Sequence, residues 1–592
     1  MPDDIDPHLA ETLAQASGAS SGNGDQQIDP QFDEAAYLRA FPDVAIAVER
    51  GDMASGLFHY ALCGRVERRL QMPAYLSARA GNGTQPAHES VGARVPRFSI
   101  DVAIASESGA VFIVGWADDR QDPLVTISVA SGHGRPHTWT RFPRLRRPDV
   151  ETVVQSTEPC NHGFWVFCND DTAPLRTDLA PADTECLVEL RFESGVTGEA
   201  RQPLLREGNG QLRDTVMGYF SAIGYHGNRT VEAFTSLDLG AGDALIRFNR
   251  ALSDSIAAGA ATERFGPNRK HFTGSIIVPL FGISEFFFLQ SCLYSQGKGI
   301  ADYEFIYVIN SPELIELIQR EARLAEMIYG LSQTLVMLPD NLGFGAANNV
   351  AARYARSDRL LCVNPDVFPR VSDWAQRHSD LLNSMPAEQT RFFGTSLYYD
   401  DGSLMHGGMY FDMDTGLHVT RENITRHVML RVEHYGKGAP AWADQFVASR
   451  RVPAVTGAFI SIARDWFEKL GGFTQDYIFG HYEDADLCLK SLAEGAPVWV
   501  HDIPMWHLEG KGAKRLPPHE GGSLLNRWLF SRNWQSLIVP ELIGQLPGHR
   551  LLREAVEIGN EVDPVTEAPL PVFAAKVSRR AAAKRPALMR VR

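Results

Sequence analysis

Four short apolar runs between residues 275 and 363 decide the fold of this 592-residue chain. They are Ser275-Ile276-Ile277-Val278, Tyr303-Glu304-Phe305-Ile306-Tyr307-Val308-Ile309, Thr334 to Leu338, and Arg359 to Val363. Helical segments are predicted between them, at Phe286 to Gln296, from Pro312 onward, and at Ala346 to Ala355. Strands that alternate with helices indicate an α/β sheet, and nearly continuous apolar runs are typical of strands covered on both faces. We therefore predict a Rossmann-like α/β domain over residues 266–545.

The other residues divide by composition into accessory segments. Residues 1–28 are rich in Ser, Gly, Ala and Gln, which predicts disorder. Residues 29–80 carry aromatic and aliphatic side chains at helical spacing, which predicts a small helical module. Short alternating runs between turn residues predict a β-rich, sandwich-like accessory domain at 96–206. A helical connector at 207–265 and a C-terminal extension with a basic tail at 546–592 complete the predicted order.

The charge balance restricts the classes of partner. The formal net charge is −15, and a nucleic-acid binder usually has a basic face, so no nucleic-acid partner is expected. The tail from Lys576 to Arg592 is the exception, because it carries seven basic residues and no acidic one. Two interpretations of it stay open: a solvated, disordered tail, or a weak attraction to an anionic membrane surface that gives peripheral membrane contact.

The seven cysteines bear on the cellular compartment. Their number is odd, their spacing is irregular and none forms a Cys-x-x-Cys pair, so we expect reduced thiols and no zinc site. The acidic start from Met1 to Asp6 lacks a signal-peptide pattern, and the apolar stretch from Ser275 to Gly282 is too short to span a membrane. We therefore expect a cytoplasmic protein, peripheral at the inner membrane if the basic tail binds lipid.

Polar residues follow the predicted strands at the edge where open α/β sheets bind ligands, beyond the carboxyl ends of the strands. The segments after the four strands are Pro279-Leu280-Phe281, Asn310-Ser311-Pro312-Glu313, Asp340 to Asn349, and Asn364-Pro365-Asp366. Gly343 and Gly345 allow positive φ and a close approach of backbone to a ligand. A plain turn and helix entry is the alternative interpretation of the third segment, and a strand-ending turn is that of the fourth.

These segments and four later ones resemble family 2 glycosyltransferases, especially the rhamnosyltransferase-like branch. The run Asn341-Leu342-Gly343-Phe344-Gly345-Ala346-Ala347-Asn348-Asn349 resembles the family's NxGFGxxxN segment, and Asn364-Pro365-Asp366 resembles a variant of its metal-binding DxD motif. The later matches are Met405-His406-Gly407-Gly408, which resembles a hairpin of the same branch, Thr456-Gly457-Ala458-Phe459, Gly471-Gly472-Phe473, and Glu483-Asp484-Ala485-Asp486-Leu487-Cys488. Each motif is weak alone, but the ordered set from Asn341 to Cys488 is specific; it does not cover the N-terminal half.

The resemblance implies a GT-A-like catalytic domain, preceded here by the small helical module and the β-sandwich-like accessory domain. It further implies a hexosyl- or rhamnosyl-type transferase that moves a sugar, with inversion, from a nucleotide-diphosphate sugar donor to a hydroxyl of a glycan or lipid-linked saccharide acceptor. The donor-binding residues are then expected to be Pro279, Leu280, Asn310, Asn341, Gly343, Phe344, Gly345, Asn348 and Asn364. Many relatives hold the base with an Asp where this chain has Ile309, so the nucleotide stays open.

A divalent metal is expected at the diphosphate. A metal ion neutralises the charge that grows on a departing diphosphate, and Mg²⁺ or Mn²⁺ prefers carboxylate and phosphate oxygens. Asp366, at the end of a predicted buried strand, supplies such a carboxylate. The resemblance adds His507, since many family members have a histidine near this point that reaches the metal or the diphosphate. A purely structural histidine is the alternative for His507.

The chemistry also needs a base that takes the proton of the acceptor hydroxyl. By resemblance, Asp484 is that catalytic base, and Glu483 contacts the acceptor together with Gly457 and Trp506. The alternative is a charged helix start, because carboxylates at a helix N-terminus are favoured by the helix dipole alone. All these motifs lie downstream of Phe272, so we expect residues before about Phe265 to be dispensable for the reaction.

Two other functions are alternative interpretations of this sequence. A nucleotide-sugar pyrophosphorylase needs a Gly-rich phosphate loop with a basic residue after the first strand, which Pro279-Leu280-Phe281-Gly282 does not supply. A catalytically degenerate protein that binds glycans as part of an assembly is the second. Asp366 and Asp484 argue against it, whereas Ile309 argues for it.

Overall fold

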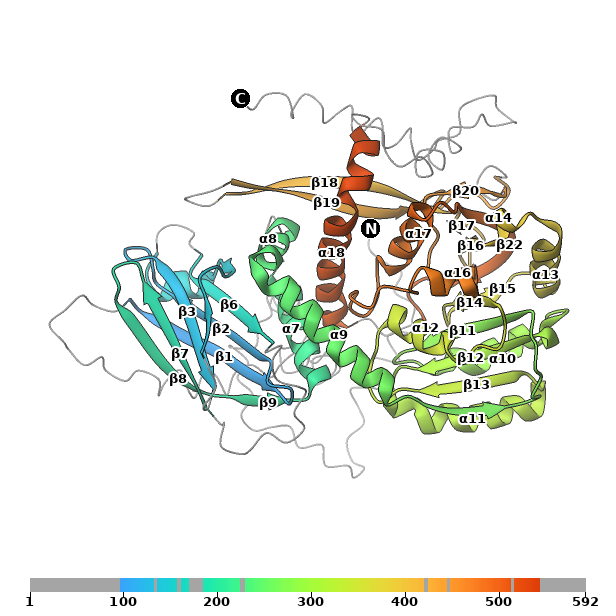
Figure 1. The fold of residues 1–592 in the computed structure, drawn as a ribbon, viewed down its shortest axis with the longest axis horizontal. Helices are drawn as coiled ribbons and strands as arrows, with labels where there is room; N and C mark the ends of the chain where they lie inside the picture. Colours follow the sequence, from blue (N-terminus) through green and yellow to red (C-terminus); the bar gives the residue numbers. More distant parts are fainter. Residues whose placement is uncertain are drawn as a thin grey trace, which may run out of the picture. The chain divides into compact units, whose positions relative to one another are not determined.

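The computed structural model describes residues 96–131, 136–156, 161–169, 185–223, 229–419, 424–443, 448–512 and 516–543. The chain divides into a unit Met1–Gly92 and a unit Ala93–Arg592, and the structure below is that of the second unit. The predictions for residues 1–28, 29–80 and 546–592 lie outside the described residues. Within the described residues the fold is mixed α/β, as predicted (Figure 1).

The accessory region consists of two sheets that share one apolar core. The first has the order β5 (Arg144–Leu145), β6 (Gly163–Cys168), β2 (Val111–Ala117), β1 (Phe98–Ser106) and β9 (Leu205–Glu207), with the short helix α6 (Pro148–Val153) beside it in sequence. The second has the order β4 (His137–Trp139), β3 (Leu124–Ser131), β7 (Glu185–Phe192) and β8 (Thr197–Pro203). Buried and exposed residues alternate along β7, as expected for a strand with one face in a core.

The main sheet has eleven strands. Its order is β10 (Ala261–Phe265), β13 (Ser332–Met337), β12 (Tyr303–Ile309), β11 (Gly274–Leu280), β14 (Arg359–Val363), β21 (Phe459–Ala463), β16 (Phe392–Tyr398), β22 (Val498–His507) and β15 (Val367–Pro369), with β17 (Leu404–His406) on β16 and β20 (Arg450–Val452) on β22. Strands β11 to β14 are mutually parallel where they pair. The strand β11 runs through Leu280, so Pro279 and Leu280 lie inside it rather than after it.

Helices cover both faces of this sheet. They are α10 (Glu285–Ser295), α11 (Ile315–Tyr329), α12 (Phe344–Ala352), α13 (Trp374–Ser384), α14 (Ala387–Thr390), α16 (Arg464–Lys469) and α17 (Glu483–Ala493), with 3₁₀ turns at Ile300–Asp302 and Pro312–Leu314. Successive residues of β11 belong to different apolar clusters, Ile277 to the one that includes α12 and Ile276 to the one that includes α10 and α11. Both faces are therefore buried, which explains the continuous apolar runs.

The connector contains more than helices. After α7 (Asn209–Ile223), α8 (Arg229–Ser236), a π-helical turn (Leu237–Ala241) and α9 (Gly242–Ala258), strand β10 pairs antiparallel with β13 of the main sheet. The predicted helical connector over 207–265 therefore ends in a strand at Ala261–Phe265. A five-residue strand can pair at a sheet edge without a strong periodic signal of its own, because its partner strand supplies the hydrogen bonds.

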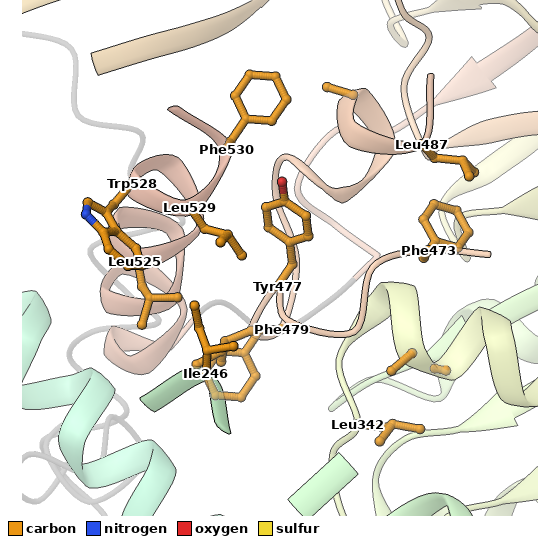
Figure 2. Packing of buried hydrophobic residues seen from close by; sticks show 14 of the residues in the cluster. Ile246, Leu342, Phe473, Tyr477, Phe479, Leu487, Leu525, Trp528, Leu529 and Phe530 are labelled. Carbon is orange, nitrogen blue, oxygen red and sulfur yellow. The ribbon is translucent and has the colours of Figure 1, made fainter. Parts of the chain in front are cut away.

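The long helix α18 (Pro517–Ile543) packs along α7 and contacts the hairpin of β18 (Met409–Val419) and β19 (Ile424–His434). A Cβ on Gly521 of α18 would lie 1.9 Å from the carbonyl oxygen of Met217, so the two helix backbones touch there. Figure 2 shows one apolar cluster with members from the connector (Ile246), from α18 (Leu525, Trp528) and from a loop of the main domain (Phe479). Within the described ranges, no helix is both long enough and apolar enough to serve as a membrane span.

Candidate functional site

The structure brings the last predicted motifs together at the carboxyl end of β14. The backbone N–H of Asn364 donates to the carbonyl oxygen of Ala458 at 3.0 Å, which joins the Asn-Pro-Asp segment to the start of β21. One residue earlier, the N–H of Gly457 donates to Oδ2 of Asp484 at 2.8 Å. Segments about 90 and 120 positions apart along the chain from Asn364 therefore meet at one stretch of backbone, residues 456–458.

The donor segment 341–349 is shaped by asparagine side chains. Asn310 accepts from the N–H of Leu342 at 2.7 Å and donates to the carbonyl oxygen of Gly343 at 3.1 Å. Asn341 accepts from the N–H of Gly343 at 2.9 Å. Asn348 is fully buried and donates to the carbonyl oxygen of Phe344 at 2.9 Å. These amides build the loop, and their direct contact with a donor stays a prediction.

Gly343 has φ +79°, and a Cβ there would lie 2.8 Å from the backbone of Phe479. Glycine is therefore needed at this point both for its conformation and for its size. Gly345 lies against Phe473 and Glu483, since a Cβ on it would come within 3.4 Å of both. In this structure, therefore, the groups that lie close to these two glycines belong to other segments of the protein.

The donor segment interlocks with the Gly471-Gly472-Phe473 turn through a residue that the sequence prediction left unassigned. Asn349 donates to the carbonyl oxygen of Phe473 at 2.8 Å and accepts from its N–H at 2.9 Å. A Cβ on Gly472 would lie 2.4 Å from Oδ1 of Asn349, so glycine leaves room for this pairing. The rings of Phe344 and Phe473 meet edge to face with their centroids 5.7 Å apart. This pairing joins the donor segment to the Gly471-Gly472-Phe473 turn.

The two predicted metal ligands lie side by side. Val367 of β15 pairs with His507 of β22, which brings the His507 Nε2 within 3.4 Å of Oδ1 of Asp366. The other oxygen of Asp366 accepts from the N–H groups of Gly512 at 2.8 Å and Lys511 at 3.2 Å. Oδ1 itself is buried and makes no hydrogen bond. A Cβ on Gly512 would lie 2.5 Å from that atom, so only glycine lets this backbone cover Asp366 so closely.

Two further histidines, to which the sequence prediction gave no role in the site, lie close enough to His507 to interact with it electrostatically. His406 and His434 share an Nδ1–Nδ1 contact of 2.9 Å, and Nε2 of His406 accepts from the N–H of Gly408 at 3.2 Å. Burial lowers the pKa of His406 well below its usual value and that of His434 to about 4, so both rings are neutral at neutral pH. Among the described residues, no group of three or more His, Cys, Asp or Glu side chains could hold a metal ion by itself.

The start of α17 carries a coupled pair of carboxyl groups. Burial raises the pKa of Glu483 well above its usual value, and the neighbouring charge of Asp484 raises it further. Burial also raises the pKa of Asp484, although the N–H groups of Gly457 and Ala485 donate to its two oxygens and stabilise the charged form. Glu483 is therefore the member of the pair that keeps its proton, and Asp484 the member that ionises first.

The third carboxylate of this motif, Asp486, accepts hydrogen bonds from the fold on both of its oxygens. It accepts hydrogen bonds from Thr474 at 2.6 Å, from Trp534 at 2.8 Å and from Tyr477 at 3.2 Å. These partners come from the segment before α17 and from α18. Asp486 therefore fixes the helix start rather than facing a substrate.

The segment that leads into α17 has an unusual backbone. Phe479, His481 and Tyr482 have φ values of +62°, +81° and +76°, a region that favours glycine. We name residues 478–482 the Phe479 loop. The side chain of Asn526, on α18, accepts from the N–H of Ile478 and donates to carbonyl oxygens of Ile478, Gly480 and His481. No sequence signal marked this loop, because its three residues with positive φ are Phe, His and Tyr rather than the usual turn formers.

Three of the predicted site residues, Pro279, Leu280 and Trp506, lie within strands. Pro279 and Leu280 are buried in β11, and Leu280 belongs to the apolar core, so its side chain does not face the site. Trp506 lies on the opposite face of β22 from its neighbour His507, since side chains alternate along a strand. Its ring packs against the guanidinium of Arg370, 4.6 Å away, which in turn lies over Tyr398. The structure does not bring Trp506 to Asp366.

Comparison with known proteins gives distant likenesses. No family model matches the chain. The uncharacterized protein y4gI of Sinorhizobium fredii (strain NBRC 101917 / NGR234) is 28% identical over 167 residues, which is 28% of this chain and 17% of that relative. The chain thus spans about a sixth of the length of this curated relative.

Two solved structures resemble part of the fold. The structure of GalNAc-T7 with UDP, GalNAc and Mn²⁺ is 13% identical, has a TM-score of 0.31, and covers 54% of this chain and 58% of that chain. The mannosyltransferase PcManGT from Pyrobaculum calidifontis in complex with GDP-Man and Mn²⁺ is 15% identical, has a TM-score of 0.29, and covers 62% of this chain and 98% of that chain. Likenesses of this size do not show what the chain does.

Proposed function

We propose that this chain is a glycosyltransferase that moves a sugar from a nucleotide-diphosphate sugar to a hydroxyl of a glycan or lipid-linked saccharide, with inversion. One observation carries the proposal: Asn364, two residues before the Asp366–His507 pair, and the Asp484 carboxylate hydrogen-bond to the adjacent residues Ala458 and Gly457. Contacts between the motifs support it, because Gly457 lies against both Phe344 and Asp484, and Asn349 pairs with Phe473. The accompanying prediction is a hexosyl- or rhamnosyl-type transfer, which the choice of donor will test.

Asp484 is the base in this proposal. In a single displacement, the acceptor oxygen forms its bond to the anomeric carbon as the bond from that carbon to the diphosphate oxygen breaks. The hydroxyl proton passes to a carboxylate oxygen of Asp484, and the nucleoside diphosphate leaves with the electron pair. A base works best when its pKa lies closer to the operating pH, and the raised pKa of Asp484 moves it in that direction.

The Asp366–His507 pair fits a divalent ion that is shared with the donor. A buried carboxylate oxygen without a hydrogen bond beside an imidazole nitrogen is a partial set of ligands, which donor phosphate oxygens and water would complete. Mg²⁺ or Mn²⁺ bound there would stabilise negative charge on the departing diphosphate. The backbone N–H groups of Lys511 and Gly512 hold the second oxygen of Asp366 and so fix the direction of the first.

A catalytically degenerate glycan-binding protein is the alternative. It is favoured by one feature of the donor side: Ile309 ends β12, and the Asn310 amide that follows is engaged on both its atoms with the donor segment. A base contact must then come from other residues. The two functions differ in one measurable way, since a degenerate protein would bind sugars or donor without turnover.

Calorimetric titration of the full chain with a panel of nucleotide sugars, with and without Mn²⁺, tests the proposal together with a transfer assay. We expect metal-dependent donor binding, and we expect Asp366→Asn to weaken it by on the order of tenfold or more. Asp502→Asn is the matched control, because Asp502 is an exposed carboxylate on the same strand as His507. Donor binding that is equal in EDTA overturns the metal role. Binding without any transfer or donor hydrolysis selects the degenerate alternative.

A further inference from the structure

We infer that Arg213, on helix α7 of the connector, is a positioning residue of the site: it holds the donor segment and the Phe479 loop in register. The inference rests on the proposed function for its catalytic consequence, although the contacts themselves do not. It also reverses the expectation that residues before about Phe265 are dispensable for the reaction.

Arg213 touches both segments at once. Its Nη1 donates to the carbonyl oxygen of Asn341 at 2.7 Å, and its guanidinium lies 4.6 Å from the centroid of the Phe479 ring. Asn341 belongs to the segment that opens α12, and Phe479 lies four residues before α17. A planar guanidinium suits this position, because it donates in its plane while its face packs on an aromatic ring.

Burial shows that this arginine is part of the interior. Arg213 is 3% exposed, and its charge is accompanied by the neighbouring carboxylate of Asp214, whose Oδ1 lies 3.1 Å from Nε. A buried charge is costly unless it is paired and hydrogen-bonded, so this residue is far from interchangeable with an apolar one of similar size. Removal of the guanidinium would leave the Asn341 carbonyl oxygen without this donor.

A second contact ties the same helix to the same segment. A Cβ on Gly210, in the first turn of α7, would lie 1.9 Å from Oδ2 of Asp340, so this carboxylate sits directly on the helix start. A negative charge is favoured there by the helix dipole. Helix α7 therefore meets residues 340 and 341 at two points, and packs along α18, whose Asn526 holds the backbone of the Phe479 loop.

The contacts of Arg213 affect the position of Asp484, the proposed base. The backbone of Phe479 accepts a hydrogen bond from the N–H of Phe344, and Asp484 follows five residues after Phe479. The guanidinium of Arg213 packs on the ring of Phe479, the residue whose carbonyl oxygen accepts this hydrogen bond. Loss of the clamp would let the two segments shift relative to each other, and a shift of about 1 Å can cost about a hundredfold in rate.

The test compares Arg213→Met, Arg213→Lys and Arg250→Met in the full chain. Arg250 is the matched control, because it lies on the neighbouring helix α9 and pairs with Asp476, close to the same loop, but is 55% exposed. For Arg213→Met we expect kcat to fall by roughly 10- to 100-fold while donor affinity stays within about threefold. Arg213→Lys keeps a donor for Asn341 and should recover part of the loss, and Arg250→Met should stay within about twofold of the wild type.

Hydrogen exchange separates this inference from the proposed function. In Arg213→Met, the amides of Phe344 and Ile478 should exchange faster, whereas those of β7 in the accessory region should not change. Unchanged exchange at Phe344 and Ile478 overturns the clamp, whatever the enzyme does. Faster exchange with unchanged kcat in the folded protein overturns the positioning role. If the wild type binds no donor, the proposed function fails, and exchange still decides whether Arg213 holds the two segments.

Discussion

Two helices begin at the site, and they reach their first turns in different ways. Helix α12 follows Gly343, whose φ of +79° carries no steric cost for a glycine. Helix α17 follows Tyr482, and there Phe479, His481 and Tyr482 all have positive φ although none is glycine. Such a conformation costs roughly 1–2 kcal/mol for each ordinary residue. The backbone before α12 thus needs only a glycine, whereas the backbone before α17 needs stabilising contacts from other parts of the molecule.

These stabilising contacts come from two helices far away in sequence. Asn526 of α18 hydrogen-bonds the backbone of the Phe479 loop at four points, and the ring of Tyr482 packs on Phe530 of the same helix with centroids 5.3 Å apart. Arg213 of α7 packs on Phe479. Backbone strain persists where the surrounding structure holds it, and such residues cluster at functional sites. The base proposed for the reaction sits directly after the strained segment.

The largest effect is expected from Asp484→Asn at the start of α17. The amide keeps the size of the side chain but cannot take a proton, so turnover should fall by roughly 10² to 10⁴ while donor affinity stays nearly unchanged. A charged helix start without a catalytic role would instead give a stability loss of about 0.3–1 kcal/mol and near-normal turnover. Melting temperature, donor affinity and kcat are to be measured on one sample. Transfer within threefold of wild type in a stable variant would point to Glu483 as the base.

The next largest effect concerns the start of α12. Gly343→Ala adds a Cβ at positive φ and against the backbone of Phe479, so we expect a loss of about 3 kcal/mol in the free energy of unfolding. Gly402→Ala is the control, because Gly402 also has positive φ but has open space around it, and should lose only about 1 kcal/mol. Urea unfolding measures both. Equal losses for the two variants would show that the contact between the donor segment and the Phe479 loop is not tight.

The pH dependence should separate activity from stability at the start of α17. Because the pKa of Asp484 is raised, its carboxylate form is lost as pH falls through that raised pKa, and kcat should drop by up to about tenfold per pH unit. For stability the sign is opposite. The folded chain binds more protons than the unfolded chain between the usual pKa of Glu483, 4.5, and its raised value, so the free energy of unfolding decreases as pH rises through this range.

This opposition can be checked with kcat and urea midpoints over the same pH series. Glu483→Gln removes the buried carboxyl group and should flatten the decrease in stability with rising pH. A stability slope that is the same in wild type and Glu483→Gln would mean that Glu483 ionises as an exposed carboxyl does.

The smallest effect tests the strain in the Phe479 loop directly. His481 is exposed and has φ +81°, so His481→Gly should be more stable than His481→Ala by about 1 kcal/mol. Both variants lose the contact of the imidazole with Ser523, so their difference isolates the backbone term. Chemical unfolding of the two variants gives the number. A more stable alanine variant would show that the loop relaxes out of the left-handed region.

The strands of the main sheet could be predicted closely, because their signal is local. The predicted limits of Tyr303–Ile309 and Arg359–Val363 coincide with β12 and β14. A strand buried on both faces must be apolar throughout, and that pattern is visible without any knowledge of its partners. The edge strand β10 was missed, since its residues Ala261 to Phe265 are mostly exposed and are defined by pairing with β13.

The predicted site shows the same division. Asp366 and His507 were expected to act together, and the β15–β22 pairing brings them into contact. Trp506, one residue away from His507, was assigned to the acceptor, a role that stays a prediction; the alternation along β22 places its ring on the other face, against Arg370. A sequence motif gives the position of a residue along the chain, whereas the face on which its side chain lies depends on the register of the strand.

By itself, the sequence determined which residue types are available at the carboxyl edge of the sheet, because apolar runs and the glycines and carboxylates between them are set by local physics. Only the tertiary structure decided how these residues are held. Arg213 and Asn526 act on segments more than 40 positions away, through a buried guanidinium and a buried amide. No periodicity or spacing encodes such contacts, since their energy comes from burial and hydrogen bonds that exist only when distant helices pack together.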